Sequence, residues 1–448
     1  MNILIFSPVK IFPSDAGSRV RILNFINKLK NLGHVIHYVY YSQHGLDKKH
    51  FDYMQEFCDS FSIVEKKHNV VLKNGNYDID EWYEDSIYEK INELINKFKI
   101  DTVLANYIFY SKFFEKIPDN IYKIIDTHDK FTDRYKLFEN DNNINYTWHS
   151  YSREDEQKAL NRANLIVSIT DEEKEYFASL VEKDIVTIGH IEEKKYINYN
   201  SKELKKIGFI GGANQVNISA INKFLEEFYK SSKNQSDVKF IIAGQVCKHI
   251  RVENKNIELL GLVNKLDDFY NNIDLIINPL TFGTGQKIKT IESLSYGIPI
   301  ISTDIGFEGI NSQHNFHKLS THYDMIKEID RIYENSEILK DMSKTSIEIF
   351  DKYFEDINNK FLDTFGLSEI NEIDEELLKE HKIETKIKLD SLIIEKYEKK
   401  LKQLNKKIKH YETLKDAIKK LTKISFFRNP FIKFKLYQKV LKVYYDKK

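Results

Sequence analysis

Several residue types that mark particular protein classes are scarce in this sequence. Among 448 residues there are two cysteines, Cys58 and Cys247, which lie far apart. This excludes a disulfide framework and a zinc-type cysteine spacing, and it suits a reducing cytoplasm. No apolar run reaches the roughly 18 residues that a membrane span needs. The first residues, MNILIFSP, lack a basic flank, so we interpret them as a β-strand rather than a signal peptide.

A net charge is also lacking, because 68 Lys and Arg balance 68 Asp and Glu, but the balance is uneven. Residues 401–448 contain 15 basic and 3 acidic side chains, with aromatic residues interleaved. A basic, aromatic tail on a mildly acidic body is typical of a helix that lies on an anionic membrane. We therefore predict a cytoplasmic protein at the inner face of the membrane. Nucleic acid is not expected as a partner, since no binding motif for it is present.

The tail has two further interpretations. Apolar side chains follow a 4–3 spacing, with Asp390 at one seam position: Ile383, Ile387, Ile394, Tyr397, Leu401, Leu404, Ile408 and Tyr411. This heptad-like pattern predicts a coiled coil that would support a homodimer. Packing of the tail helices on the protein's own body is the third interpretation.

The rest of the chain alternates short β-branched runs with segments of helical period, which predicts an α/β fold with parallel sheets covered on both faces. The alternation restarts near residue 205 after a polar stretch, 193–204. We therefore predict a first Rossmann-like domain over 1–192 and a second over 205–345, followed by a helical tail over 367–448.

Glycine is used sparingly, yet it recurs where loops lead into helices. Three loops of this kind contain Gly17, Gly211 with Gly212, and Gly283 with Gly285. Because parallel sheets bind ligands at the carboxyl ends of their strands, and because helix N-termini attract anions, these glycines are candidate binding residues. A tight turn is the alternative explanation for Gly211 and Gly212, and Gly17 could serve only to open a helix.

The stretch FGTGQKIKTIE adds charges to the third loop. Lys287 and Lys289 would supply cations for an anion, and Glu292 would lie one helical turn deeper. A carboxylate there suits the two hydroxyls of a ribose rather than a phosphate. The combination predicts a nucleoside diphosphate lying along the junction between loop and helix.

This stretch, continued as SLSYGIPIISTDIGFEGI, resembles the donor-binding signature of GT-B glycosyltransferases of the group 1, or family 4, type. Other segments resemble the same family in the same order, including DTHDKFTDR, RANLIVSITDEE and IGFIGGANQVN. The first glutamate of the family's usual pair is replaced near Gly285, and the usual Arg and Lys are not evident after Gly212. The resemblance covers about residues 1–365.

The resemblance implies two Rossmann-like domains facing a cleft, with a helix over 346–366 crossing back to the first. It implies a retaining, metal-independent hexosyltransferase in surface polysaccharide or glycoconjugate biosynthesis. The donor would be a nucleoside diphosphate sugar, and the acceptor a glycan, a lipid-linked sugar or a protein. Neither a metal nor another cofactor is expected. Lys287 and Glu292 would be catalytic, and Lys287 would take over charge from the missing basic residues.

The resemblance also gives a catalytic role to His128, in the segment DTHD. Asp126 or Asp129 would orient its ring, whereas Arg134 is expected in an ordinary ion pair. Two alternative functions stay open from the sequence. One is a nucleotide-sugar epimerase of GT-B fold, and the other is an inactive GT-B scaffold protein.

Overall fold

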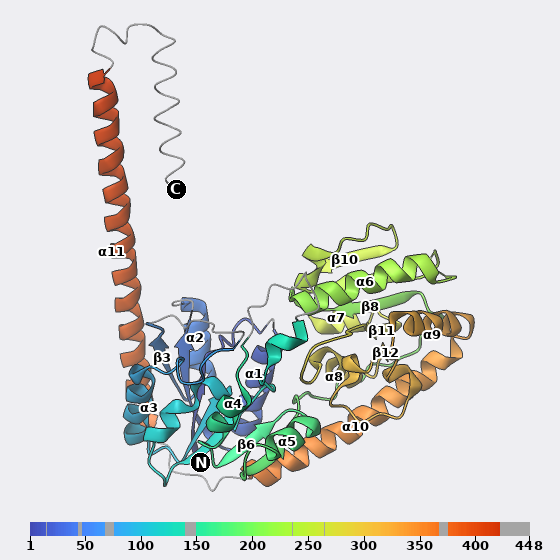
Figure 1. Ribbon diagram of the computed structural model, residues 1–448, viewed down its shortest axis with the longest axis horizontal. Helices are drawn as coiled ribbons and strands as arrows, with labels where there is room; N and C mark the ends of the chain where they lie inside the picture. Colours follow the sequence, from blue (N-terminus) through green and yellow to red (C-terminus); the bar gives the residue numbers. More distant parts are fainter. Residues whose placement is uncertain are drawn as a thin grey trace. The chain divides into compact units, whose positions relative to one another are not determined.

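Two parallel sheets organise the first 366 residues (Figure 1). The structure is a computed structural model that describes residues 1–14, 16–43, 47–67, 76–138, 149–234, 236–263, 265–366 and 375–421. By its contacts the chain divides into one unit, Met1–Leu378, and a second that begins at Lys379.

The first sheet has seven strands in the order β3-β2-β1-β4-β5-β6-β7, and all of its neighbours are parallel. Their bounds are β1 Asn2–Ser7, β2 Val35–Ser42, β3 Ser60–Glu65, β4 Thr102–Asn106, β5 Tyr122–Asp126, β6 Leu165–Ser168 and β7 Asp184–Thr187. Every residue of β2 is buried. Such burial requires cover on both faces, which explains the continuous apolar runs in the sequence.

Helices cover this sheet and connect its strands. They are α1 Gly17–Asn31, α2 Lys48–Phe57, α3 Asp85–Phe98, α4 Arg153–Leu160 and α5 Asp171–Ala178, with short 3₁₀ helices η1 Ile108–Lys116 and η2 Arg134–Phe138. Side chains of Asp47, Ser152 and Thr170 accept hydrogen bonds from the first turns of α2, α4 and α5. These polar residues therefore fix where those helices begin.

The second sheet has five parallel strands in the order β10-β9-β8-β11-β12. The elements are β8 Lys206–Ile210, α6 Gln215–Ser231, β9 Lys239–Ala243, η3 Gln245–His249, β10 Ile257–Gly261, α7 Leu266–Tyr270, β11 Leu275–Asn278, α8 Ile288–Ser295, β12 Ile300–Ser302, η4 Ile305–Phe307, η5 Asn315–His317 and α9 His322–Glu334. Strand order reverses beside β1 in the first sheet and beside β8 in the second. Ligands of such sheets bind at these reversals. The expected α/β fold with two Rossmann-like domains is confirmed.

Helix α10, Glu337–Phe365, contacts both halves of this unit (Figure 1). Phe350 belongs to the core beside the second sheet, whereas Phe361 lies 5.0 Å from Phe25 of α1, between ring centroids. The helix begins at Glu337, so the predicted start near residue 346 falls inside it. Buried Leu339 and Met342 continue the same helical face, and no proline or glycine interrupts the chain there.

Beyond this unit, α11 spans Glu375–Leu421. Its predicted seam exposes large apolar side chains, namely Ile383, Ile387, Ile394, Leu401 and Leu404. The side chains of Tyr397, Ile408 and Tyr411, and the whole segment after residue 421, lie outside the described residues. The membrane-binding and dimerisation hypotheses therefore stay predictions. Among the described helices, none is both long and apolar enough to cross a membrane.

Candidate functional site

The candidate site begins where α6 and α8 start, at the carboxyl edge of the second sheet. Asn214 caps α6 by accepting a hydrogen bond from the backbone N–H of Asn217, at 2.8 Å. The Asn217 side chain donates to the carbonyl oxygen of Gly212 at 3.1 Å and accepts from Nζ of Lys289. Asn217 thus joins the glycine loop before α6 to the first turn of α8, so that the N-termini of two helices, each the positive end of a helix dipole, lie close together.

Two glycines that the sequence marked as candidate binding residues, Gly211 and Gly283, also have structural roles, and these roles differ. Gly211 is fixed by backbone hydrogen bonds to Ala243 and Val246, both at 3.1 Å. Gly283 has a φ of +120°, where side chains are rarely tolerated, and a Cβ built on it would lie 3.8 Å from Val216 in the first turn of α6. Gly283 therefore lets the loop turn closely past α6.

Lys289 and Glu292 lie one turn apart on α8, and the pKa values of both side chains are shifted from their ordinary values. Burial lowers the pKa of Lys289 to about 7, with Lys287 acting in the same direction and Glu292 against it. Burial raises the pKa of Glu292 to about 7, while the Tyr270 hydroxyl, which donates to its Oε1 at 2.7 Å, opposes that shift. Paired shifts of this kind are common at ligand sites, because both groups lack the charged partner that a ligand can bring.

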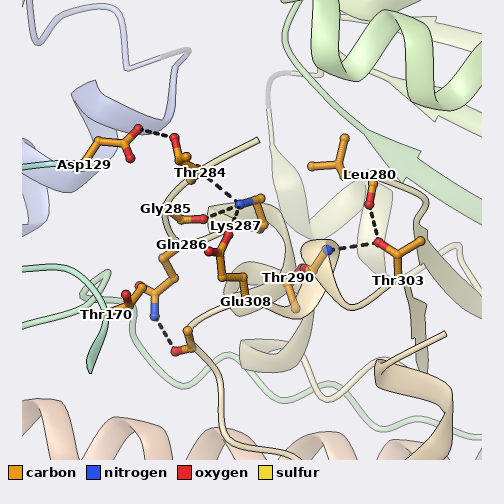
Figure 2. A network of polar contacts seen from close by, with 12 residues as sticks. Asp129, Thr170, Leu280, Thr284, Gly285, Gln286, Lys287, Thr290, Thr303 and Glu308 are labelled. Atoms are coloured by element: carbon orange, nitrogen blue, oxygen red, sulfur yellow. Dashed lines mark hydrogen bonds and ion pairs between the residues drawn. The ribbon is translucent and has the colours of Figure 1, made fainter. Parts of the chain in front are cut away.

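Lys287 is held differently from Lys289. Its Nζ donates to Oε2 of Glu308 at 2.8 Å, to the carbonyl oxygen of Thr284 at 3.2 Å and to that of Gly285 (Figure 2). The side chain is only 8% exposed. The ammonium therefore braces the glycine loop, and its predicted role toward a diphosphate stays a prediction.

The same loop reaches the first sheet. The Thr284 hydroxyl donates to Oδ2 of Asp129 at 3.0 Å (Figure 2), and the Gln286 side chain accepts from the backbone N–H of His190 at 2.6 Å. Gly285 has a φ of +72°, and a Cβ on it would lie 3.1 Å from Ile169. Gly17, the first residue of α1, is similarly close: its Cβ would lie 2.7 Å from Ile288 of α8. Both glycines allow the two sheets to approach.

A cavity of about 600 Å³ lies between these elements. The second sheet's side contributes Asn214, Thr284, Gly285, Gln286 and Ile288 to its lining. The first sheet's side contributes Pro8, Val9, Ser18, Arg21, Gln43, Tyr107, Phe109, His128, Asp129, Phe131, Arg134, His149, Ile169 and His190. Of the predicted site residues, the cavity brings together His128 and Gly285. Lys287, Lys289, Glu292, Gly17, Gly211, Gly212 and Gly283 are not in its lining.

His128 follows β5, and its ring is tightly held. Nε2 lies 2.7 Å from Oδ1 of Asn106 and 3.3 Å from Oδ2 of Asp126. The ring also stacks on Tyr107, with centroids 4.2 Å apart. Burial lowers the pKa of His128 to about 4, although the Asp126 carboxylate opposes that shift. The imidazole is therefore neutral at physiological pH.

Backbone strain is concentrated beside this ring. Tyr107 has φ 73° and ψ 142°, and His128 has φ 63°. Side chains at such dihedral angles cost of order 1–3 kcal/mol each, and they persist only where the surrounding structure enforces them. Both residues lie at carboxyl ends of neighbouring strands, at the wall of the cavity.

Two ion pairs support the first sheet's side. Arg21 of α1 contacts Asp126, with Nη2 2.7 Å from Oδ1, and both side chains are buried. Arg134 pairs with Asp129 at 2.6 Å while also lining the cavity. From the sequence we expected Arg134 to form an ordinary ion pair and not to face the cavity. Asp126 lies next to His128 as expected, and Asp129 instead accepts from Thr284.

Sequence reasoning missed Asn106, Tyr107, Asn217, Tyr270 and Gln286. Gln286 lies inside the quoted motif, where its spacing between Gly285 and Lys287 was a usable signal. The other four lie at strand or helix ends far from the motif, where only the fold places them. Among the described residues, His, Cys, Asp and Glu do not gather into a metal-binding group of three.

Comparison with known proteins gives this geometry a context. Residues 204–335 match the family model described as glycosyl transferases group 1. A curated relative, an uncharacterized 44.6 kDa protein in the cps region of Klebsiella pneumoniae, is 22% identical over 345 residues, which cover 70% of this chain and 85% of the relative.

Several solved structures share the fold. A TarM variant of S. aureus, solved with UDP, fondaparinux and α-GlcNAc-glycerol, has a TM-score of 0.60 at 12% identity, covering 82% of this chain and 100% of that one. The pneumococcal O-GlcNAc transferase GtfA with UDP and GlcNAc gives 0.57 at 12% identity, covering 82% and 98%. HepE of Anabaena with UDP and glucose gives 0.56 at 12% identity, covering 81% and 99%. The predicted resemblance to group 1 glycosyltransferases of GT-B fold is confirmed.

Proposed function

We propose that this chain, which carries a group 1 glycosyltransferase domain in a GT-B fold, transfers a sugar from a nucleoside diphosphate sugar to a hydroxyl group of an acceptor. The acceptor is a glycan, a lipid-linked sugar or a protein. The observation that carries the proposal is the meeting of the α6 and α8 N-termini at Lys289 and Asn217, with Glu292 one turn deeper. Beside them, the Gly283–Gly285 loop leads into the cavity.

The parts of the donor would take separate places. The positive N-terminal ends of α6 and α8 and the Lys289 ammonium suit the diphosphate. The Glu292 carboxylate, oriented by Tyr270, suits the ribose hydroxyls. UDP is the nucleoside diphosphate to test first, because TarM, GtfA and HepE were each solved with UDP.

The chemistry we propose is substitution with retention and without a metal ion. The bond between the anomeric carbon and the phosphate oxygen breaks, and the acceptor oxygen bonds to that carbon from the same face. The acceptor proton passes to the departing diphosphate. Lys289 and the helix N-termini stabilise the negative charge that develops there, and Lys287 holds the loop that closes around it. One such contact typically contributes a factor of about 10²–10³ to kcat.

The relative and the tail support proposals about the biosynthetic role, the location and the oligomeric state of the protein. A relative in a cps region supports a role in surface polysaccharide biosynthesis. The basic tail supports work at the inner face of the membrane, and the seam of α11 supports a homodimer. Deleting residues 424–448 should release the protein into the soluble fraction, and unchanged membrane association would refute the membrane hypothesis.

A panel of nucleotide sugars and free nucleotides, read by thermal shift and then by product analysis, tests the function. Stabilisation by one nucleotide family in the wild type, lost in Glu292→Gln and kept in the exposed control Glu226→Gln, is the expected result. Conversion of the donor sugar without any acceptor would instead identify an epimerase. Absence of stabilisation by every nucleotide would contradict the proposal and favour an inactive scaffold.

A further inference from the structure

The end of β4 places two consecutive residues around the His128 ring. Asn106, the last residue of β4, is buried, and its Oδ1 lies 2.7 Å from Nε2 of His128. Tyr107, the next residue, stacks on the same ring with planes 17° apart. The ring is therefore fixed in its own plane by a hydrogen bond and across its plane by an aromatic contact.

The orientation of the Asn106 amide follows from its second contact. Its Nδ2 donates to the carbonyl oxygen of Phe6 in β1 at 3.2 Å. A carbonyl oxygen can only accept, so the amide nitrogen must face Phe6, and Oδ1 must face His128. This removes the usual ambiguity between the amide oxygen and nitrogen.

The tautomer of His128 follows in turn. Oδ1 of Asn106 and the carboxylate Oδ2 of Asp126, 3.3 Å from Nε2, are both acceptors. Nε2 therefore carries the proton, and in the neutral ring Nδ1 is an acceptor. Among the described residues, Nδ1 has no hydrogen-bond partner, and the side chain lines the cavity.

We propose that Asn106 and Tyr107 are positioning residues that hold His128 in its Nε2-protonated form, with Nδ1 available to accept a hydrogen bond from a sugar hydroxyl in the cavity. This inference rests on the proposed transferase function for the identity of the ligand. The hydroxyl belongs to the donor sugar or to the acceptor sugar, and the chemistry at Nδ1 is the same for both. The two strained backbone positions, at Tyr107 and His128, are what this arrangement requires.

Charged groups around the ring agree with this role. Asp126 faces Nε2, and Arg21 of α1 holds that carboxylate, with its Nη2 2.7 Å from Oδ1 of Asp126. Because the carboxylate is already paired, it acts on His128 as an acceptor and not as a group that takes its proton. The ring can therefore accept from a hydroxyl without becoming charged.

The test is ¹⁵N NMR of the full chain with labelled histidine, in which the His128 signals are assigned by their loss in His128→Gln. The wild type should show a protonated Nε2 and an unprotonated Nδ1 at pH 7. Asn106→Ala should give a mixture of tautomers, whereas Asn106→Asp, which still offers an acceptor oxygen, should keep Nε2 protonated. Asn222→Ala removes an equally buried asparagine beside the second sheet and should leave the His128 signals unchanged.

Ligand arms of the same experiment identify the hydroxyl. A shift of the Nδ1 signal on addition of UDP-glucose, but not of methyl α-glucopyranoside, assigns it to the donor, and the opposite result assigns it to the acceptor. Wild-type protein with a protonated Nδ1, or Asn106→Ala with an unchanged tautomer, would overturn the inference. The NMR signals need no turnover. The tautomer prediction can therefore be wrong while nucleotide binding persists, and nucleotide binding can be absent while the tautomer prediction is correct.

Discussion

The two sides of the candidate site are built in contrasting ways. The second sheet's side takes Gly283, Gly285, Lys289 and Glu292 from one stretch of ten residues, of which Gly285 lines the cavity. The first sheet's side takes Asn106, Tyr107 and His128 from the ends of β4 and β5, together with Arg21 from α1 and Arg134 from η2. One side can be read from a motif, whereas the other exists only after the sheet has formed.

The difference is also electrostatic. Lys289 and Glu292 are half-buried, and desolvation moves both of their pKa values to about 7, so that side is prepared for a charged ligand. On the other side the charges are already paired with each other, Arg21 with Asp126 and Arg134 with Asp129, and His128 is neutral. This difference in charge supports our proposal that the second sheet's side binds a diphosphate and the first sheet's side binds uncharged hydroxyls.

The largest expected effect comes from breaking the charged side. Lys289→Met and Glu292→Gln should each lower kcat for sugar transfer by about 10²–10³, or roughly 3–4 kcal/mol, because each removes a contact to the donor. The exposed Lys230→Met on α6 should have the wild-type rate. Steady-state kinetics measure this, and wild-type rates in both variants would remove the two residues from the site.

Glycine substitutions give the next largest effect, and they compare the loop before α8 with the loop before α6. Gly285→Ala places a Cβ 3.1 Å from Ile169 at a φ of +72°, so it should lower the free energy of unfolding by about 1–3 kcal/mol. Gly212→Ala meets nothing within 4 Å and should change it by less than about 0.5 kcal/mol. Urea denaturation measures both. Equal losses would mean that the approach of the two sheets does not depend on Gly285.

The pH dependence of donor binding sharpens the electrostatic contrast. As pH rises through about 7, Lys289 loses its proton, and the site loses the cation that is proposed to face the diphosphate. Glu292 becomes ionised over the same range, which forms the carboxylate proposed for the uncharged ribose and does not replace the lost cation. The affinity for UDP-glucose should therefore fall above pH 7, by at most about tenfold per pH unit for each proton linked to binding. Calorimetric titration from pH 6 to pH 9 checks this. Lys289→Met should flatten the profile, and a rising affinity would contradict the assignment.

The smallest effect tests the strain on the first sheet's side. Tyr107→Gly should be more stable than Tyr107→Ala by about 1 kcal/mol, because glycine adopts a φ of 73° without strain. Thermal denaturation of the two variants measures the effect of backbone strain alone, since both variants lack the aromatic ring. The usual order, with alanine the more stable, would mean that the backbone at this position is relaxed.

The sequence predicted the parallel sheets well, because strands buried on both faces, such as β2, are rich in β-branched and aromatic residues. It also predicted the glycine loops and the charges beside them, which are adjacent in the chain. It could not predict that Lys287 donates a hydrogen bond to Glu308, which lies 21 residues away along the chain. Nor could it show Asn106 beside His128, because that contact depends on the pairing of β4 with β5.

Domain ends were harder to predict for a related reason. Helix α10 extends from Glu337 to Phe365 because its buried face continues through Leu339 and Met342, which lie before the helix over 346–366 that the resemblance implied. The seam of α11 was visible as a 4–3 pattern, but a pattern does not identify what covers it. Ile387 and Ile394 are exposed in the single chain, so the homodimer stays a prediction.

Calorimetric titration of UDP into three proteins tests the division of the site most directly: the wild type, Lys289→Met and Asn106→Ala. We predict that the wild type binds UDP, that Lys289→Met loses this binding, and that Asn106→Ala keeps the wild-type affinity, because only the second sheet's side holds the nucleotide. Loss of binding in Asn106→Ala with full binding in Lys289→Met would contradict the assignment of the two sides.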